Sequence, residues 1–266
     1  MINITLYLRE MKKSIKMLLI FGVVITMYVC IIIGMYDPQM METLDSFYEM
    51  MPELMASVGM SIGANSLMGF MVSYLYGFIL LIFPMVFCIL RGNGLIAKYM
   101  DSGAMSVLLA APIKRKKIVC TQLAVLLSGV CLLVLYITGL ELVVAESKFP
   151  GELEITQLLE LNVALLCLHL FIAGICFLAS CLFSDSKYSI GFGAGIPAFM
   201  YVLQMLSNVG EKAEVAKYFT FFTLFDADGI AAKEAGAFSG AIVLLIGAII
   251  MYVLGSMVFC KKDICV

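Results

Sequence analysis

The sequence is poor in charge and in histidine, and both shortages limit what the protein can be. Charged residues make up 14% of the 266 positions, hydrophobic residues make up 63%, and the mean hydropathy is +1.06. A soluble domain is about half apolar and a quarter charged. These proportions exclude an ordinary soluble protein. They predict one membrane domain, residues 1–266, that contacts membrane lipid and has no nucleic-acid partner.

Motifs for metal binding, disulfide formation and ATP hydrolysis are also missing. None of the nine cysteines lies in CxxC spacing, and the single histidine, His169, excludes HExxH and other histidine clusters. No GxxxxGK[ST] phosphate loop is present, so the chain has no ATP site of that kind. We interpret the cysteines as buried apolar thiols. We expect no catalytic residue, no metal and no cofactor bound by the chain itself.

Long apolar runs take the place of these motifs. A membrane helix needs about 20 mostly apolar residues. The runs are unbroken rather than alternating with a period of two, which favours helices over strands. We therefore expect an all-α integral membrane protein with six transmembrane helices, at residues 17–36, 66–90, 118–145, 158–183, 188–207 and 238–259.

Charges of opposite sign gather on opposite sides of these runs. The N-terminus, residues 91–117, residues 184–187 and the C-terminal tail together hold 13 of the 17 Lys and Arg residues, but only 4 of the 19 Asp and Glu residues. Cytoplasmic loops carry the excess of Lys and Arg. The sequence therefore predicts that both termini are cytoplasmic. The basic run Lys114–Lys117 would hold the start of the third span on that side.

Two segments on the opposite side have apolar character of their own. Residues 40–58 carry apolar side chains at spacings of three and four, with acidic residues off that stripe. This pattern predicts an amphipathic helix, on the outer membrane surface or against other spans, and a substrate site there is a weaker interpretation. Residues 208–237 are also apolar, and we expect them to enter the bilayer partly, as a broken helix.

Few polar residues fall inside the predicted spans. His169 has no acidic partner near the middle of its span, so we interpret it as a packing residue rather than a proton relay. Glu141 and Glu160 lie near outer helix ends and are interpreted as boundary residues. Ser73, Tyr74 and Tyr76 form a polar patch that either faces a substrate pathway or anchors the helix at the interface.

The fifth predicted span carries a GxxxG pair, Gly191 and Gly195. Small residues allow helix backbones to approach closely in lipid. The pair is compatible with packing inside the chain and equally with a face that binds a second copy, and the sequence leaves both interpretations open.

The connection from Arg91 to Lys117 is long for a turn between two spans. Residues 95–109 lack proline and predict a helix, which Gly103 weakens by about 1 kcal/mol relative to alanine. Pro112 ends that helix, because the residue before a proline disfavours helical geometry. A cytoplasmic helix followed by basic residues and a span is suited to transmit force when a partner protein grips it.

This connection resembles a motif of the ABC-2 type exporter permeases. That family shows an acidic pair, then Gly-Thr, Leu-Leu and Pro-Ile-Ser-Arg before its third span. The matching positions here are Asp101, Gly103-Ala104, Leu108-Leu109 and Pro112-Ile113-Lys114-Arg115. Residues 51–60 (MPELMASVGM), the N-terminal segment and the tail VFCKKDICV are also similar to the family, so the resemblance covers nearly the whole chain in order.

The sequence departs from the family pattern at four positions. Tyr99 and Met100 stand where the acidic pair is usual, and Ala104 and Lys114 replace Thr and Ser. The remaining motif still implies a coupling helix between the second and third spans.

The resemblance implies the permease subunit of an ATP-driven exporter. It implies a cytoplasmic interfacial helix over residues 1–16 and a coupling helix within 91–117, docked on a separate ATP-binding subunit that holds ATP and magnesium. The coupling residues that it implies are Tyr99, Asp101, Gly103, Met105, Leu108, Leu109, Pro112, Ile113, Lys114 and Arg115.

The resemblance further implies a dimer of permeases in the plasma membrane of a bacterium, with the substrate path between the two halves. Residues assigned to the dimer face or pathway are Ser73, Tyr76, Gly191 and Gly195. An amphiphilic drug, peptide or lipid would suit the apolar interior. Two other classes stay open: a non-transport sensor or scaffold that uses the same loop, and an ion-coupled secondary carrier that uses His169.

Overall fold

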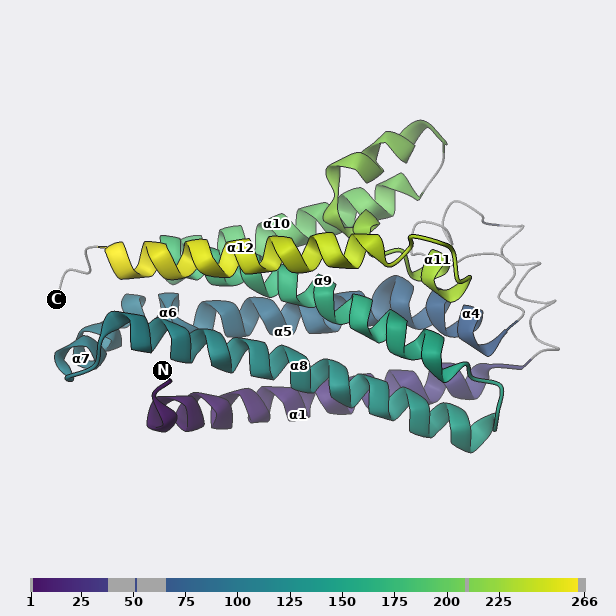
Figure 1. Ribbon diagram of the computed structural model, residues 1–266, viewed down its shortest axis with the longest axis horizontal. Helices are drawn as coiled ribbons and strands as arrows, with labels where there is room; N and C mark the ends of the chain where they lie inside the picture. Colours follow the sequence, from purple (N-terminus) through teal and green to yellow (C-terminus); the bar gives the residue numbers. More distant parts are fainter. Residues whose placement is uncertain (1, 38–50, 52–65, 209–210, 263–266) are drawn as a thin grey trace.

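The computed structural model describes residues 2–37, 51, 66–208 and 211–262, and every regular element in these residues is a helix. Figure 1 shows the long helices lying along the long axis of an elongated bundle. The prediction of an all-α multi-pass membrane protein is confirmed, because six helical stretches are long and apolar enough to span a membrane. The amphipathic helix expected over residues 40–58 lies outside the described residues, except for Met51.

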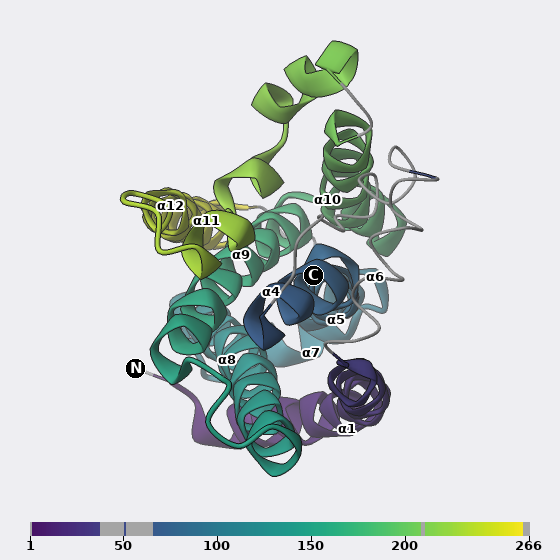
Figure 2. The ribbon, with the colours of Figure 1, turned by 90° about the vertical axis from the view of Figure 1, so that its right-hand side faces the viewer.

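Helix α1 (Ile4–Met35) is one continuous helix of 32 residues, so the expected interfacial helix and first span are not separate elements. No proline or glycine interrupts its first half. The Ser14 hydroxyl donates to the Glu10 carbonyl at 3.3 Å, a backbone contact that bends helices. Figure 2 shows the first part of α1 slanting across the bundle before the rest follows its long axis.

The second span is built from α4 (Leu67–Met71), the π-helix η1 (Val72–Ile79) and α5 (Leu80–Leu95). Ser66 begins it as an N-cap, because its hydroxyl accepts from the Gly69 N–H at 3.1 Å. Pro84 lies within α5 and cannot donate the hydrogen bond of a regular helix, one turn after the π-helix ends.

The helix expected over residues 95–109 is in fact two short helices, α6 (Ala97–Asp101) and α7 (Ala104–Ala110). Gly103 separates them with a φ of 70°, a left-handed conformation that glycine adopts without strain. The glycine therefore breaks the helix rather than weakening it. Ala111, before Pro112, is extended, so the predicted stop at this proline is confirmed.

The remaining spans are α8 (Arg115–Lys148), α9 (Ile155–Leu182), α10 (Ser186–Ser207) and α12 (Ser239–Lys261). Asp185 closes the tight turn between α9 and α10 by accepting from the Lys187 N–H at 2.7 Å. Between α10 and α12 the described residues form three short helices, η2 (Glu211–Phe219), η3 (Phe221–Leu224) and α11 (Ala227–Ala231), in place of one continuous helix. The expected entry of this segment into the bilayer stays a prediction.

Helix α9 is the centre of the bundle and packs against α5, α8, α10 and α12 (Figure 2). Its most apolar stretch is 72% buried, against 22% for α1 and for α10. His169 joins α9 to α5: its ring nitrogens lie 2.9 Å from the Leu165 carbonyl oxygen and 3.3 Å from that of Leu81. This is the packing role expected from the sequence. The exposed apolar faces of α1 and α10 are suited to lipid or to another protein.

Candidate functional site

The start of α1, the end of α12, α7 and the start of α8 lie at one end of the bundle in Figure 1. We call it the basic end, because the run Lys114–Lys117 begins α8 there. The residues that resemble the coupling motif all belong to this end. The side chains in and around α6 and α7 divide into those that face the bundle and those that face outward.

A buried carboxylate ties α6 to α1. Glu10 is fully buried, and its Oε1 accepts from the Tyr99 hydroxyl at 2.5 Å and from Lys13 Nζ at 2.7 Å. Arg91, 5% exposed, donates to the Glu10 carbonyl oxygen at 3.3 Å and lies 3.6 Å from the carboxylate Oε2. We call Glu10, Lys13, Arg91 and Tyr99 the Glu10 network. Tyr99, expected to contact a partner, contacts α1 within the chain, and its contact with a partner stays a prediction.

The Glu10 network was missed in the sequence because its members are far apart in the chain. The available signal was Glu10 itself, the one acidic residue in a segment with Arg9, Lys12 and Lys13. An ion pair buried at a helix junction is costly to break, since removal of one partner leaves an uncompensated charge. The network therefore fixes the position of α6 relative to α1.

The apolar stripe of α7 also faces the bundle. Met105 is 1% exposed, and Leu108 and Leu109 pack against the core. The outward surface consists of other residues of the motif: Asp101, Gly103 and Pro112 are exposed, and so is Val107, at 75%. The predicted coupling residues therefore form two groups, one that faces the bundle and one that faces outward. Leu108 and Leu109 belong to the first group and attach α7 to the bundle.

The end of the motif is tied to α9 and α12. Lys114 is exposed, Ile113 packs against the core, and Arg115 donates to the Lys262 carbonyl oxygen at 2.7 Å. The Lys262 ammonium in turn donates to the Leu182 carbonyl oxygen at 2.7 Å, where α9 ends. Burial lowers the pKa of the Lys262 ammonium, and the Cys181 thiol partly opposes this.

A second polar cluster lies inside the bundle, toward the other end. The Glu141 Oε2 atom accepts from the Tyr76 hydroxyl and from the Asn162 amide, each at 2.8 Å. All three side chains are buried, Glu141 completely. The interpretation of Glu141 as a boundary residue is therefore wrong. Helix α8 continues to Lys148, so position 141 lies two turns inside it and faces its neighbours.

Tyr76 lies in the π-helix η1, a rare geometry that is frequent at functional sites. Ser73, in the same segment, is 1% exposed, so neither side chain is an interfacial anchor. The ring of Tyr76 borders a hollow of about 320 Å³ that Gln204, Asp226 and Asp228 also line. This arrangement is compatible with a pathway next to η1.

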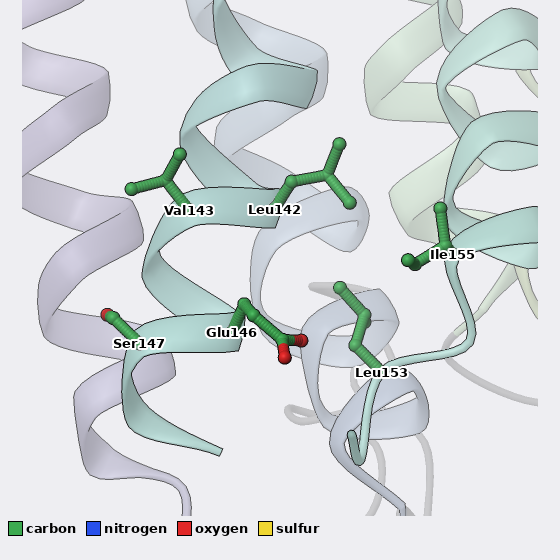
Figure 3. Close-up of a pocket in the computed structure, with 6 residues that line it drawn as sticks. All are labelled: Leu142, Val143, Glu146, Ser147, Leu153 and Ile155. Carbon is green, nitrogen blue, oxygen red and sulfur yellow. The ribbon is translucent and has the colours of Figure 1, made fainter. Parts of the chain in front are cut away.

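Another hollow, of about 630 Å³, lies where α8 ends and α9 begins (Figure 3). The side chain of Glu146 points from α8 toward Leu153 in this view, and the other lining residues are apolar except Ser147. It has a single carboxylate and no converging polar groups, so we assign no binding role to it.

Comparison with known proteins gives one family. The family described as Protein of unknown function (DUF2705) matches residues 28–265. The chain belongs to the DUF2705 family. No curated protein and no solved structure matches it. The family match therefore covers five of the six spans in full and part of α1, without assigning an activity to any of them.

In this DUF2705 chain the glycine pair, Gly191 and Gly195, lies on a face of α10 that no other described helix covers. No atom of the described residues lies within 4 Å of a Cβ built at Gly191 or Gly195. Gly193, between them, faces α9 and accepts from the Cys176 thiol at 3.2 Å through its carbonyl. Packing inside the described chain therefore does not explain the pair, which leaves a face for lipid or a second protein.

Two kinds of enzymatic site can be compared with the described residues. Among the described residues, no group of His, Cys, Asp and Glu is arranged to hold a metal ion. Residues 59–63 (GMSIG) match the GxSxG spacing of serine hydrolases, but they lie outside the described residues. That motif works at a turn from a strand to a helix, whereas each regular element described is a helix.

Proposed function

We propose that this chain is the permease subunit of an ATP-driven exporter of the ABC-2 type. The observation that carries the proposal is the outward surface of α6 and α7, which keeps Asp101, Gly103 and Pro112 of the family motif exposed. The absence of a phosphate loop from the sequence fits a chain that relies on a separate ATP-binding subunit, which would hold ATP and magnesium.

The proposed orientation has the basic end in the cytoplasm of a bacterium, with the chain in the plasma membrane. The support is the excess of Lys and Arg in the polar segments at this end, since cytoplasmic loops carry that excess. An ATPase docked on α6 and α7 would then lie on the side where ATP is available.

The Glu10 network suggests how a movement of α6 would spread through the permease. Tyr99 attaches α6 to Glu10 on α1, and Arg91 attaches the end of α5 to the same residue. A shift of α6 and α7, driven by closure of the ATPase pair, would therefore displace α1 and α5 together. In our proposal this displacement turns the pathway from inward-facing to outward-facing, between two permease copies.

The substrate class that we propose is an amphiphilic molecule, such as a drug, a peptide or a lipid. The bundle exposes apolar faces on α1 and α10, which would face the second copy, and it has polar groups next to η1. Such a path offers mostly apolar contacts with a few hydrogen-bonding groups.

The test is co-expression of the chain with a candidate ABC-type ATP-binding subunit from the same genome, followed by co-purification and measurement of ATP hydrolysis. Val107→Asp places a charge on the outward face of α7, and we expect it to abolish both. Val215→Asp is the matched control, because Val215 is 62% exposed in η2, away from the basic end. We expect the control to behave as wild type.

Loss of both co-purification and ATP hydrolysis in the Val107→Asp variant, but not in the control, would assign the ATPase contact to α7. No complex between the wild-type chain and the ATPase would contradict the exporter proposal, whereas unchanged assembly and hydrolysis in both variants would show that the ATPase contact lies outside α7. Assembly with hydrolysis that no amphiphile stimulates would favour a sensor or scaffold. Substrate flux that continues without the ATPase would favour a secondary carrier, and in that case Glu141 would be tested before His169.

A further inference from the structure

Helices α8 and α12 leave a groove between them at the basic end, with a volume of about 520 Å³. Its deeper part is apolar, with Val119 and Leu123 from α8 and Val253 and Met257 from α12. Lys116 and Lys261 lie at the end of the groove nearest the helix termini. Each helix thus contributes one lysine and an apolar stripe.

The two stripes run parallel to the helix axes. On α8 the lining positions are separated by three, one and three residues, and on α12 by one, three, one, three and one. These are the spacings of one helix face. From Val253 to Lys261 the groove extends eight residues, or about 12 Å at 1.5 Å per residue, which is most of the ~15 Å hydrocarbon depth of one membrane leaflet.

The basic side chains at this end differ in whether they have a hydrogen-bond partner within the described chain. Arg115 and Lys262 donate to backbone carbonyls, and so connect the ends of α8, α9 and α12. Lys116 and Lys261 are exposed, and within the described chain neither makes an ion pair or a side-chain hydrogen bond. None of the residues that line the groove is acidic. A negative group between these two lysines would meet no repulsion there.

We propose that this groove binds one anionic diacyl phospholipid. Its phosphate lies between Lys116 and Lys261, and an acyl chain lies along the apolar stripes of α8 and α12. Basic pockets between transmembrane helices bind anionic lipid headgroups in this way. The charge and the apolar length together select a lipid, since a free phosphate ion would use only the lysines. This inference does not depend on the exporter proposal.

The experiment measures lipid binding to the purified full chain in detergent micelles by native mass spectrometry. The probes are phosphatidylglycerol and phosphatidylcholine with identical acyl chains. We expect the wild type to retain one phosphatidylglycerol in preference to phosphatidylcholine. The double variant Lys116→Gln, Lys261→Gln should bind phosphatidylglycerol about 25-fold more weakly, at roughly fivefold for each lysine.

The matched control is Lys114→Gln with Lys117→Gln, which removes the same charge from exposed neighbours outside the groove. We expect a change of less than about threefold, from the loss of long-range attraction alone. An equal loss in both double variants would show a diffuse surface attraction and overturn the proposal. So would equal retention of the two lipids by the wild type.

A second variant tests the acyl part of the site. Val253→Trp fills the apolar stripe with an indole while both lysines remain, and it should weaken phosphatidylglycerol binding at least tenfold. Soluble glycerol phosphate should not displace the lipid. Unchanged binding by this variant, or displacement by glycerol phosphate at the concentration of the lipid, would reduce the site to a headgroup contact and overturn the proposal. Circular dichroism and thermal unfolding confirm that each variant is folded.

Discussion

The Tyr76 hydroxyl donates a hydrogen bond of 2.8 Å to the carboxylate of Glu141, 65 positions further along the chain. The same carboxylate oxygen accepts from Asn162 at 2.8 Å. One atom on α8 therefore joins the π-helix η1 to α9. Because all three groups are buried, each depends on the others for its hydrogen bonds.

The first prediction concerns the acceptor in this cluster. Glu141→Leu removes it and leaves the Tyr76 hydroxyl and one Asn162 N–H without a partner. A buried group left unpaired costs about 1–3 kcal/mol, so we expect a clear fall in the thermal unfolding temperature in detergent. Glu141→Gln keeps an acceptor of similar shape and should cost less than about 1 kcal/mol. Equal stability of the leucine variant and wild type would show that the cluster does not hold the helices.

The second prediction concerns the Glu10 network. Arg91→Met leaves the fully buried Glu10 carboxylate short of a cation, which costs about 3–5 kcal/mol at buried pairs. Lys13→Met should cost about 1 kcal/mol or less, because the Lys13 side chain is 50% exposed.

A double-mutant cycle checks the physical reason for this difference. Glu10→Gln combined with Arg91→Met removes both charges, so the double variant should be more stable than Arg91→Met alone. Chemical unfolding in detergent measures all the variants on one scale. If the losses of unfolding free energy in the two single variants simply add up in the double variant, the pair at 3.6 Å, Arg91 and Glu10, does not contribute an interaction energy to stability.

The third prediction compares two glycines. A Cβ built at Gly92 would lie 2.5 Å from the Cβ of Cys176 on α9, whereas one built at Gly139 meets nothing within 4 Å in the described chain. Gly92→Ala should therefore destabilise the α5–α9 contact by about 1–3 kcal/mol. Gly139→Ala should be neutral or stabilising by up to about 1 kcal/mol, since alanine favours helices. Thermal unfolding of both variants measures this difference. A Gly92→Ala variant that is more stable than the Gly139→Ala variant would contradict the described contact between α5 and α9.

The fourth prediction concerns the open glycine face of α10. Gly191→Leu adds bulk where the described chain has no neighbour, so the monomer should unfold at the wild-type temperature. If a second copy packs on this face, as the proposed permease dimer requires, the variant should lose dimer in light-scattering measurements in detergent.

Gly193→Leu is the control for this experiment, because a Cβ at Gly193 would lie 3.4 Å from the Cα of Cys176 on α9. We expect it to lower the unfolding temperature of the monomer itself. A Gly191→Leu variant that dimerises as the wild type does would show that the permeases meet through another surface.

The sequence predicts the spans well, because long apolar runs determine them almost alone. Helix α9 begins three residues before its predicted start and ends within one residue of its predicted end. The break at Gly103 was not predicted, because glycine lowers helix propensity without revealing whether its φ will be positive. The bend in α1 depends on a hydrogen bond between Ser14 and the Glu10 backbone, which composition does not encode.

The site was predicted less well than the fold, for a reason visible in Glu141 and Tyr99. Glu141 was assigned by its distance from a helix end and Tyr99 by its place in the motif that resembles the exporter family, but the environment of both is set by residues on other helices. The partners of Glu141 lie 65 and 21 positions away, and the Glu10–Tyr99 bond spans 89. A single sequence contains no signal for such long-range pairs.

The hydrogen bonds of Glu141 also bear on how the chain enters the membrane during synthesis. A charged side chain at the centre of an isolated membrane helix raises the cost of insertion by about 2.5–3.5 kcal/mol, and Glu141, two turns from the end of α8, carries part of this cost. Asn162 follows it by 21 residues, on the next helix, and Tyr76 precedes it. Insertion of α8 and α9 together as a helical hairpin, beside a second span already in place, supplies both donors at once and keeps the carboxyl group away from lipid.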